Sequence, residues 1–355
     1  GKRSTTMTYA PDATLGSYSS PVVFRSTRDL MQSIDLARGW TRTSLYLQPT
    51  STAINDVLPK TSAAIKKFKT IKGKTAFAVA DATNTGFTGE LEDIVPGQMY
   101  KIQVSLSTPF EVYGTPIDVT ATTQTIYPNY NWIGSLSNTV MSVADAFAEL
   151  EPEKDDMVKT RTAMATYDGQ GTWEGTLQNI VPGEGYIYFS NAKTAKTFHY
   201  PRNYTSSNAM LKAPLSAQRS ASNLQHCQPV DEHLYPDNMN IIAVVLENKE
   251  RLQDVEVAAF VGGECRGAVT CRGGYYFLTV MGDSNGDINN PVELRVFDGT
   301  KEYVVDRLSF ISDAFFATLD EPYELSLDAN GINGISVKPG EVEWHTLSGI
   351  RLAAK

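Results

Sequence analysis

Two stretches of the chain, residues 89–100 (GELEDIVPGQMY) and 175–186 (GTLQNIVPGEGY), share one pattern of hydrophobic and polar positions. Seven of the twelve positions are identical, so the chain contains an internal repeat. Pro-Gly suits the two central positions of a type II turn. Apolar and polar residues alternate after each turn, which is typical of a strand with one buried face.

The sequence around the first copy predicts a small α+β module over residues 32–124. A strand is expected at residues 40–47, followed by a short helix that begins near Thr52 and that Pro59 ends. The inward face of this helix is expected to consist of Ile54, Val57 and Leu58.

The second copy predicts a matching module over residues 125–201. Trp132 corresponds to Trp40, and Ser142 is expected to cap a helix that has Asp145 three residues on. The inward positions of this second helix are Val143, Phe147 and Leu150.

Beyond the modules, residues 202–237 lack periodicity and are rich in Ser, Asn, Ala and Gln, which predicts a linker. Residues 238–328 carry short β runs that turns separate at even spacing, which favours a β-sandwich. The expected fold class is therefore mainly β, with two tandem α+β repeat modules followed by a β-sandwich domain.

Residues 1–31 are interpreted as a segment related to the end of the 238–328 domain. The sequences of residues 7–24 and 308–325 align without a gap and share an Asp, an Ala and a Pro. Either the parent polypeptide extends upstream, or this segment pairs as an added strand. Whether the native chain extends beyond Gly1 or Lys355 is open.

Composition and charge limit the classes of partner that the protein could bind. The net charge is −9, and no cluster of Lys and Arg interleaves with aromatics, which argues against capture of nucleic acid. No run approaches the roughly 20 apolar residues of a membrane span. The three cysteines allow either one disulfide and one thiol or three thiols, and a bond between Cys265 and Cys271 is open.

The polar cluster at residues 283–293 is the main candidate for a metal site. Asp283, Asn285 and Asp287 stand at alternate positions and offer the hard oxygen ligands that calcium prefers. The loop departs from the EF-hand pattern, because Ile288 takes the place of the glycine at its sixth position. The alternative interpretation is a polar hairpin turn, since Asp, Asn and Gly are ordinary turn residues.

Other clusters have a structural interpretation beside a chemical one. His226, Cys227 and His233 could ligate a soft metal, although they stand in the expected linker at irregular spacing. Acidic residues at 149–156 could hold a carboxylate pair, but a run of charges is usually a solvated surface. No G-x-S-x-G or H-E-x-x-H motif occurs, so no catalytic residue and no cofactor other than calcium is predicted.

Aromatic residues could form a stacking platform for a glycan, although such residues more often pack in cores. The candidates for this platform are Trp40, Trp132, Trp173, Tyr275 and Tyr276.

The paired modules, the segment YPDNMNIIAVV and the segment EVAAFVGGECRG together resemble tandem modules of secreted surface proteins of Bacteroidetes-type Gram-negative bacteria. The tail at residues 329–355, with EVEWHTLSGIRL, is similar to the start of a C-terminal secretion or anchoring domain. The resemblance implies an extracytoplasmic location, secreted or at the cell surface.

Two functions are consistent with these features. The first is a non-enzymatic secreted or cell-surface multi-domain protein with an adhesive, binding or structural role and an unknown protein or glycan ligand. The alternative is a set of accessory modules, possibly glycan-binding, of a larger secreted enzyme. Ligand identity and oligomeric state are beyond the sequence.

Overall fold

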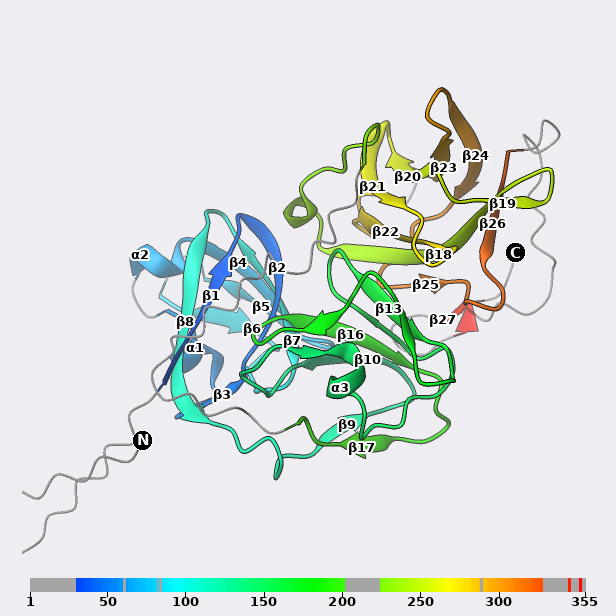
Figure 1. Cartoon of the computed structure of the whole chain (residues 1–355). Helices are drawn as coiled ribbons and strands as arrows, with labels where there is room; N and C mark the ends of the chain where they lie inside the picture. Colours follow the sequence, from blue (N-terminus) through cyan, green and yellow to red (C-terminus); the bar gives the residue numbers. More distant parts are fainter. Residues whose placement is uncertain are drawn as a thin grey trace, which may run out of the picture.

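The computed structural model describes residues 30–59, 62–81, 83, 85–201, 224–287, 290–327, 344–345 and 351–352. The chain is mainly β, as expected, with about half of the described residues in strands. Three bodies follow one another along the chain, shown in blue to cyan, green, and yellow to orange in Figure 1. We call them the first module, the second module and the third domain.

The first module has two antiparallel sheets, with strand orders β2-β7-β4-β5-β6 and β1-β8-β3. One apolar core joins both sheets and the helix α1. Its elements are β1 (Leu30–Leu36), β2 (Gly39–Ser44), β3 (Leu47–Pro49), α1 (Ile54–Val57), α2 (Ser62–Ile65), β4 (Phe68–Lys72), β5 (Phe77–Ala80), β6 (Phe87–Gly89), β7 (Met99–Val104) and β8 (Thr108–Pro116).

The second module has a five-stranded sheet with the order β10-β16-β12-β13-β14, which matches the larger sheet of the first module strand for strand. It has its own apolar core. Its elements are β9 (Gln124–Ile126), β10 (Asn129–Gly134), β11 (Met141–Ser142), α3 (Val143–Ala146), β12 (Met157–Lys159), β13 (Met164–Tyr167), β14 (Trp173–Gly175), β15 (Asn179–Ile180), β16 (Gly185–Ser190) and β17 (Lys196–Phe198).

The repeated motif forms the turn that leads into β7 and β16. Gly97 and Gly183 have φ of +77° and +84°, the conformation that the predicted turn needs. The tyrosine that ends each motif closes the turn, because the Tyr100 hydroxyl accepts a hydrogen bond from the Val95 N–H at 2.7 Å. Tyr186 accepts one from Val181 at 2.6 Å in the same way. Each motif thus forms a turn, here called the corner, that its own tyrosine stabilises by a hydrogen bond.

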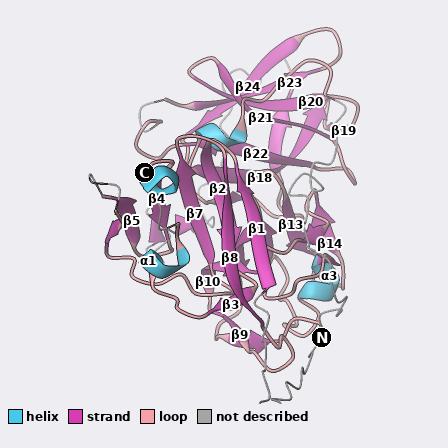
Figure 2. Ribbon diagram, turned by 90° about the vertical axis from the view of Figure 1, so that its left-hand side faces the viewer, coloured by secondary structure: helices cyan, strands magenta, loops and turns pink. Residues whose placement is uncertain are grey.

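The two predicted helices are present but shorter than a typical helix, and the helical segments are coloured cyan in Figure 2. Ser142 caps α3 as predicted, because its hydroxyl accepts a hydrogen bond from the Asp145 N–H at 3.0 Å. The helix α2 was not predicted. The residues expected to face inward are all buried: Ile54, Val57, Leu58, Val143, Phe147 and Leu150.

The third domain is a sandwich of two sheets. One has the order β19-β18-β22 with β25 and β26 also paired to β18, and the other has the order β21-β20-β23-β24. Apolar side chains of both sheets form one core. The strands are β18 (Asp237–Glu247), β19 (Glu250–Leu252), β20 (Glu256–Val261), β21 (Glu264–Thr270), β22 (Tyr276–Gly282), β23 (Val292–Phe297), β24 (Glu302–Leu308), β25 (Phe315–Phe316) and β26 (Tyr323–Ser326).

Several predictions fall partly or wholly outside the described residues. The relation proposed for residues 7–24 does so, and of the tail only β27 (Trp344–His345) and β28 (Arg351–Leu352) are described, as an antiparallel pair. Of the expected linker, the described residues 224–237 include the short 3-10 helix η2 (Glu232–Leu234). None of the helices in the described part of the chain has the length and apolar character of a membrane span.

The two modules meet along a contact that we call the seam. The Ser44 N–H donates to the Gly183 carbonyl at 3.0 Å, and the Gly134 N–H donates to the Gly97 carbonyl at 2.8 Å. Strand register makes Ser44 and Gly134 equivalent, because each follows the residue paired with the motif tyrosine. The corner of each module therefore docks on the first strand of the other module's large sheet, in a reciprocal arrangement.

Close approach at the seam depends on glycine. A Cβ on Gly134 would lie 2.1 Å from the Ser44 Cβ, and a Cβ on Gly185 would lie 2.3 Å from the Met99 Cγ. Register also makes Met99 equivalent to Gly185. At both pairs of equivalent positions, one module provides a side chain and the other provides the space for it.

Candidate functional site

Charged side chains are buried where the two modules meet the third domain. We call Arg42, Lys101, Lys159 and Asp313 the clasp. Their exposed fractions are 2%, 2%, 0% and 1%, respectively. Buried charge without a partner is strongly unfavourable, so the contacts of these four residues decide what the junction does.

Asp313 of the third domain is the centre of the clasp. Its carboxylate accepts from Arg42 Nη2 at 2.8 Å and from Lys101 Nζ at 2.8 Å, and both cations belong to the first module. Burial alone would raise the pKa of the Asp313 carboxyl, but the charges of Lys101, Arg42 and Lys159 outweigh burial and lower it to about 2. Asp313 is therefore an anion at neutral pH.

Strands β2 and β7 position the two cations. Arg42 lies on β2 and also donates to the Thr160 carbonyl and to the Asn238 side chain, both at 3.0 Å. Lys101 lies on β7, donates to Asp237 at 2.7 Å, and places its ammonium 4.6 Å from the centre of the Trp132 ring. The terminal nitrogens of Arg42 and the ammonium of Lys101 are thereby bonded to groups from the other two domains, whereas Arg42 Nε is buried without a hydrogen-bond partner.

Lys159, at the end of β12, is the member without a close carboxylate. It donates to the carbonyls of Asn238 at 3.2 Å and Ala314 at 3.4 Å, and lies 4.5 Å from the Phe315 ring. Burial, opposed by Asp313 and reinforced by Arg42 and Lys101, lowers the pKa of its amine well below 10.5. Neutral amines in a dry site can act as nucleophiles, but the side chain is closed to solvent.

Arg161 supports the same junction from the second module. Its guanidinium donates to the carbonyls of Glu232 and Tyr235, the latter at 2.9 Å. Burial lowers its pKa to about 9, so it remains charged at neutral pH. These contacts tie the described part of the predicted linker to the second module.

Apolar contacts surround the clasp. Phe315 packs in one cluster with Met99 of the first module and with Tyr130 and Ile187 of the second. A second cluster joins Met157 and Met164 of the second module to Ile242 and Phe277 of the third domain. Strand β25, which carries Phe315, therefore fixes the third domain against both modules.

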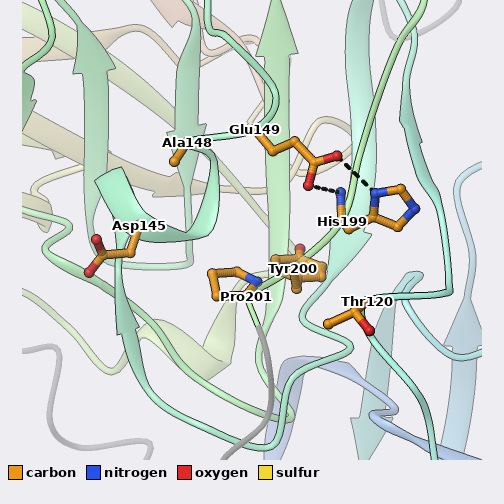
Figure 3. A pocket seen from close by; sticks show the side chains of 7 residues that line it. All are labelled: Thr120, Asp145, Ala148, Glu149, His199, Tyr200 and Pro201. Atoms are coloured by element: carbon orange, nitrogen blue, oxygen red, sulfur yellow. Dashed lines mark hydrogen bonds and ion pairs between the residues drawn. The ribbon is translucent and has the colours of Figure 1, made fainter.

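An open hollow lies on the second module beside α3 and β17 (Figure 3). The Glu149 carboxylate accepts from His199 twice, at 2.8 Å from the ring Nδ1 and at 3.2 Å from the backbone N–H. These bonds from His199 lower the pKa of Glu149. The hollow measures about 290 Å³ and is lined by Thr120, Asp145, Ala148, Glu149, His199, Tyr200 and Pro201.

The other ring nitrogen of His199 lies 3.1 Å from the Thr123 hydroxyl. Carboxylate, imidazole and hydroxyl in this order form the arrangement of a hydrolase triad. The Glu149 side chain is 56% exposed and Thr123 is exposed as well, so the group is open to water. We interpret it as a polar contact that holds β17 against the end of α3.

The predicted calcium residues lie in the loop after β22. Asp287 is buried and accepts from Arg266 Nη1 at 3.1 Å and from the Asp283 N–H at 2.8 Å. Asp283 accepts from the Asn285 N–H at 2.9 Å. These hydrogen bonds are typical of a polar turn that is stabilised by its own side chains. Calcium would have to compete with Arg266 for Asp287. Calcium binding therefore stays a prediction.

The remaining candidates are dispersed. Glu149 bonds to His199, whereas Asp156 of the same acidic run is buried and accepts from the Tyr188 hydroxyl at 2.7 Å. The aromatic residues proposed as a glycan platform lie in the cores of different domains. Tyr276 is fully buried, Trp40 is 8% exposed, and Trp173 packs against Phe147.

The soft-metal candidates separate as well. His226 and Cys227 lie together on the third domain, whereas the His233 ring bonds to the Trp40 carbonyl at 2.6 Å. All three cysteines are free thiols, and Cys265 packs with Cys227 and not with Cys271.

Sequence reasoning missed the clasp. The alternation after the turn predicted a strand with one buried face and Lys101 on its polar face, but this was wrong, because both faces of β7 are buried and Lys101 is enclosed. Comparison of the chain with protein-family models, with curated proteins and with solved structures gave no match.

Proposed function

We propose that this protein is a non-enzymatic, secreted or cell-surface multi-domain protein that works by binding or as a structural element. The observation that carries the proposal is the position of the clasp. Strongly displaced pKa values mark either catalytic sites or structural ion-pair networks. Here Lys159 and Asp313, two groups with such values, are closed to solvent between domains, where a substrate has no access.

The seam supports the same proposal. We infer that the two modules are repeats of one unit, because their large sheets have the same strand order and their corners dock reciprocally. A duplicated unit that is bonded to its own copy and clamped to a third domain has the properties of a rigid support. Such a support presents its outer surfaces at fixed distances, as adhesion and spacing require.

The experiment measures binding and turnover by the same protein. The full chain is applied to an array of glycans and extracellular-matrix proteins with and without calcium, and any ligand found is then incubated with it. We expect saturable binding and an unaltered ligand. Cleavage or chemical change of the ligand, abolished by His199→Ala, would instead make the hollow beside α3 an active site.

A second candidate is a glycan-binding accessory module of a larger enzyme. It is favoured by an open cleft of about 580 Å³ on the third domain, because carboxylate, amide and guanidinium groups suit sugar hydroxyls. The polar side chains that line it are Glu247, Arg251, Gln253, Asp254, Asp298 and Thr300.

The two candidates are separated by one pair of variants. Asp254→Asn changes an exposed carboxylate of the cleft, and Glu250→Gln changes an exposed carboxylate nearby that does not line it. Loss of glycan binding by the first variant alone supports the accessory-module candidate. Equal glycan binding by both variants excludes this cleft as the site.

A further inference from the structure

A cluster of three potential metal ligands lies at the edge of the third domain, away from the clasp. The ligand atoms of His226, Cys227 and Glu302 all lie within 4.8 Å of one another. His226 and Cys227 precede β18, whereas Glu302 begins β24, so the cluster joins two distant parts of the chain. Imidazole, thiolate and carboxylate are the ligand types of zinc.

The first two ligands are held in place by Glu256. Its carboxylate accepts the backbone N–H of Gln225, of His226 at 3.1 Å and of Cys227 at 3.1 Å. Three consecutive N–H groups on one carboxylate fix the backbone that carries the ligands. The site is therefore preorganised on this side, as metal sites require.

The other orientations are fixed as well. The His226 ring stacks on Phe297 at 3.8 Å between centroids, with its Nε2 3.0 Å from Glu302 Oε2. The second carboxylate oxygen of Glu302 accepts from Arg295 Nη1 at 2.7 Å. Hydrogen bonds of this kind to a ligating carboxylate orient it toward a metal.

Cys227 is the buried ligand, with 3% of its surface exposed. Burial raises the pKa of its thiol to about 12, and the nearby Cys265 and Glu256 act in the same direction. A divalent cation would supply the missing positive charge and release the thiol proton.

We propose that His226 Nε2, Cys227 Sγ and the Glu302 carboxylate bind a zinc-class divalent cation with one further position open. Bonds of about 2.0 to 2.3 Å around a tetrahedral zinc place its ligands roughly 3 to 4 Å apart. The three atoms approach this spacing with small side-chain movements. The cation would attach residues 225–227 to β24.

The test measures zinc retained by the reduced full chain after removal of free metal. We expect one zinc per chain. Cys227→Ser and Glu302→Gln are each expected to weaken binding at least ~10-fold. The matched controls are Cys271→Ser and His233→Ala, which leave these ligands intact and are expected to retain the zinc.

Thermal melting provides a second readout. Zinc is expected to raise the melting temperature of the parent chain and of both controls, but not of Cys227→Ser. Equal melting temperatures of all variants without zinc would show that each folds. Retention of zinc by Cys227→Ser, no zinc on the reduced parent chain, or a Cys227–Cys265 disulfide in the protein as secreted would each overturn the proposal.

Discussion

The seam joins the two modules to each other, whereas the clasp joins the modules to the third domain, and the two contacts use different kinds of interaction. At the seam, neutral backbone groups bond across glycine residues that permit close approach, as between Gly134 and Gly97. At the clasp, buried cations surround one anion, Asp313. The backbone hydrogen bonds of the seam carry no group that titrates, whereas a buried ion pair depends on the charge of both partners. Stability measurements can therefore address the two contacts separately.

The largest expected effect is the loss of the central anion. Asp313→Asn removes the carboxylate partner of buried Arg42 and leaves buried Lys101 with Asp237 alone, and removing one partner of a buried pair is worth about 3 to 5 kcal/mol of unfolding free energy. Asn tolerates the φ of +59° found at this position, so the substitution tests charge and not backbone strain.

Denaturant unfolding of Asp313→Asn measures this loss. The control is Asp320→Asn, whose partner Lys154 is exposed, as is Asp320 itself; the expected loss there is below about 1 kcal/mol. Similar losses for the two variants would show that the clasp contributes no more than a surface pair.

The next largest effect is expected from a substitution that disrupts the seam. Gly134→Ala places a methyl group against Ser44 and is expected to lower the unfolding free energy by about 1 to 3 kcal/mol through overpacking. Gly286→Ala is the control, since its new Cβ would have only an ordinary contact, 3.6 Å from Asp283.

The reciprocal geometry gives this prediction a sharper form. Ser44 Oγ donates to the Glu184 carbonyl at 2.8 Å, and a Cβ at Gly134 would lie 3.3 Å from the equivalent carbonyl of Gln98. We expect the exchange Ser44→Gly with Gly134→Ser to recover most of the stability that Gly134→Ser alone removes. A double variant as unstable as the sum of its single variants would contradict the reciprocity.

Acid should weaken the clasp and spare the seam. The pKa of Asp313 is about 2 in the folded chain against 3.8 ordinarily, so its contribution is complete above pH ~4 and is lost as the pH falls toward 2. A difference of this size corresponds to about 2 kcal/mol. Unfolding free energies between pH 5 and 2 should fall less steeply for Asp313→Asn than for Gly134→Ala, and parallel curves would refute the assignment.

The smallest effect concerns Lys159. Its pKa is lowered, so the unfolded chain binds more protons than the folded chain, and stability should rise with pH toward 10.5. Lys159→Met removes a buried amine at similar volume and is expected to change the unfolding free energy at pH 7 by less than about 1 kcal/mol. It should also flatten the rise between pH 7 and 10, which urea titrations at each pH would measure.

Much of the fold was predictable because its signals are local. Ser142 and Asp145 lie three residues apart, and the Pro-Gly pairs define corners within a few positions. Strand β21 is harder to predict, because its sequence ECRGAVT lacks the apolar run found in β18, β20 and β22.

The candidate sites were less predictable because their partners are remote in sequence. Arg42 and Asp313 are 271 positions apart, and only the docking of three domains brings them together. The loop at Asp283 shows the same limit, since its oxygens suggested a metal while Arg266 on β21 bonds to Asp287. His226 and Cys227 were noted, but their third partner, Glu302, lies beyond the span of a motif.

The position of Asp313 late in the sequence also affects the order in which the domains can assemble during synthesis. Both modules precede residue 313, so during synthesis they can fold while Arg42 and Lys101 are still hydrated. The arrival of Asp313 then supplies the anion that makes dehydration of those cations favourable. A nascent chain that ends before this residue would lack the anion that Arg42 and Lys101 share.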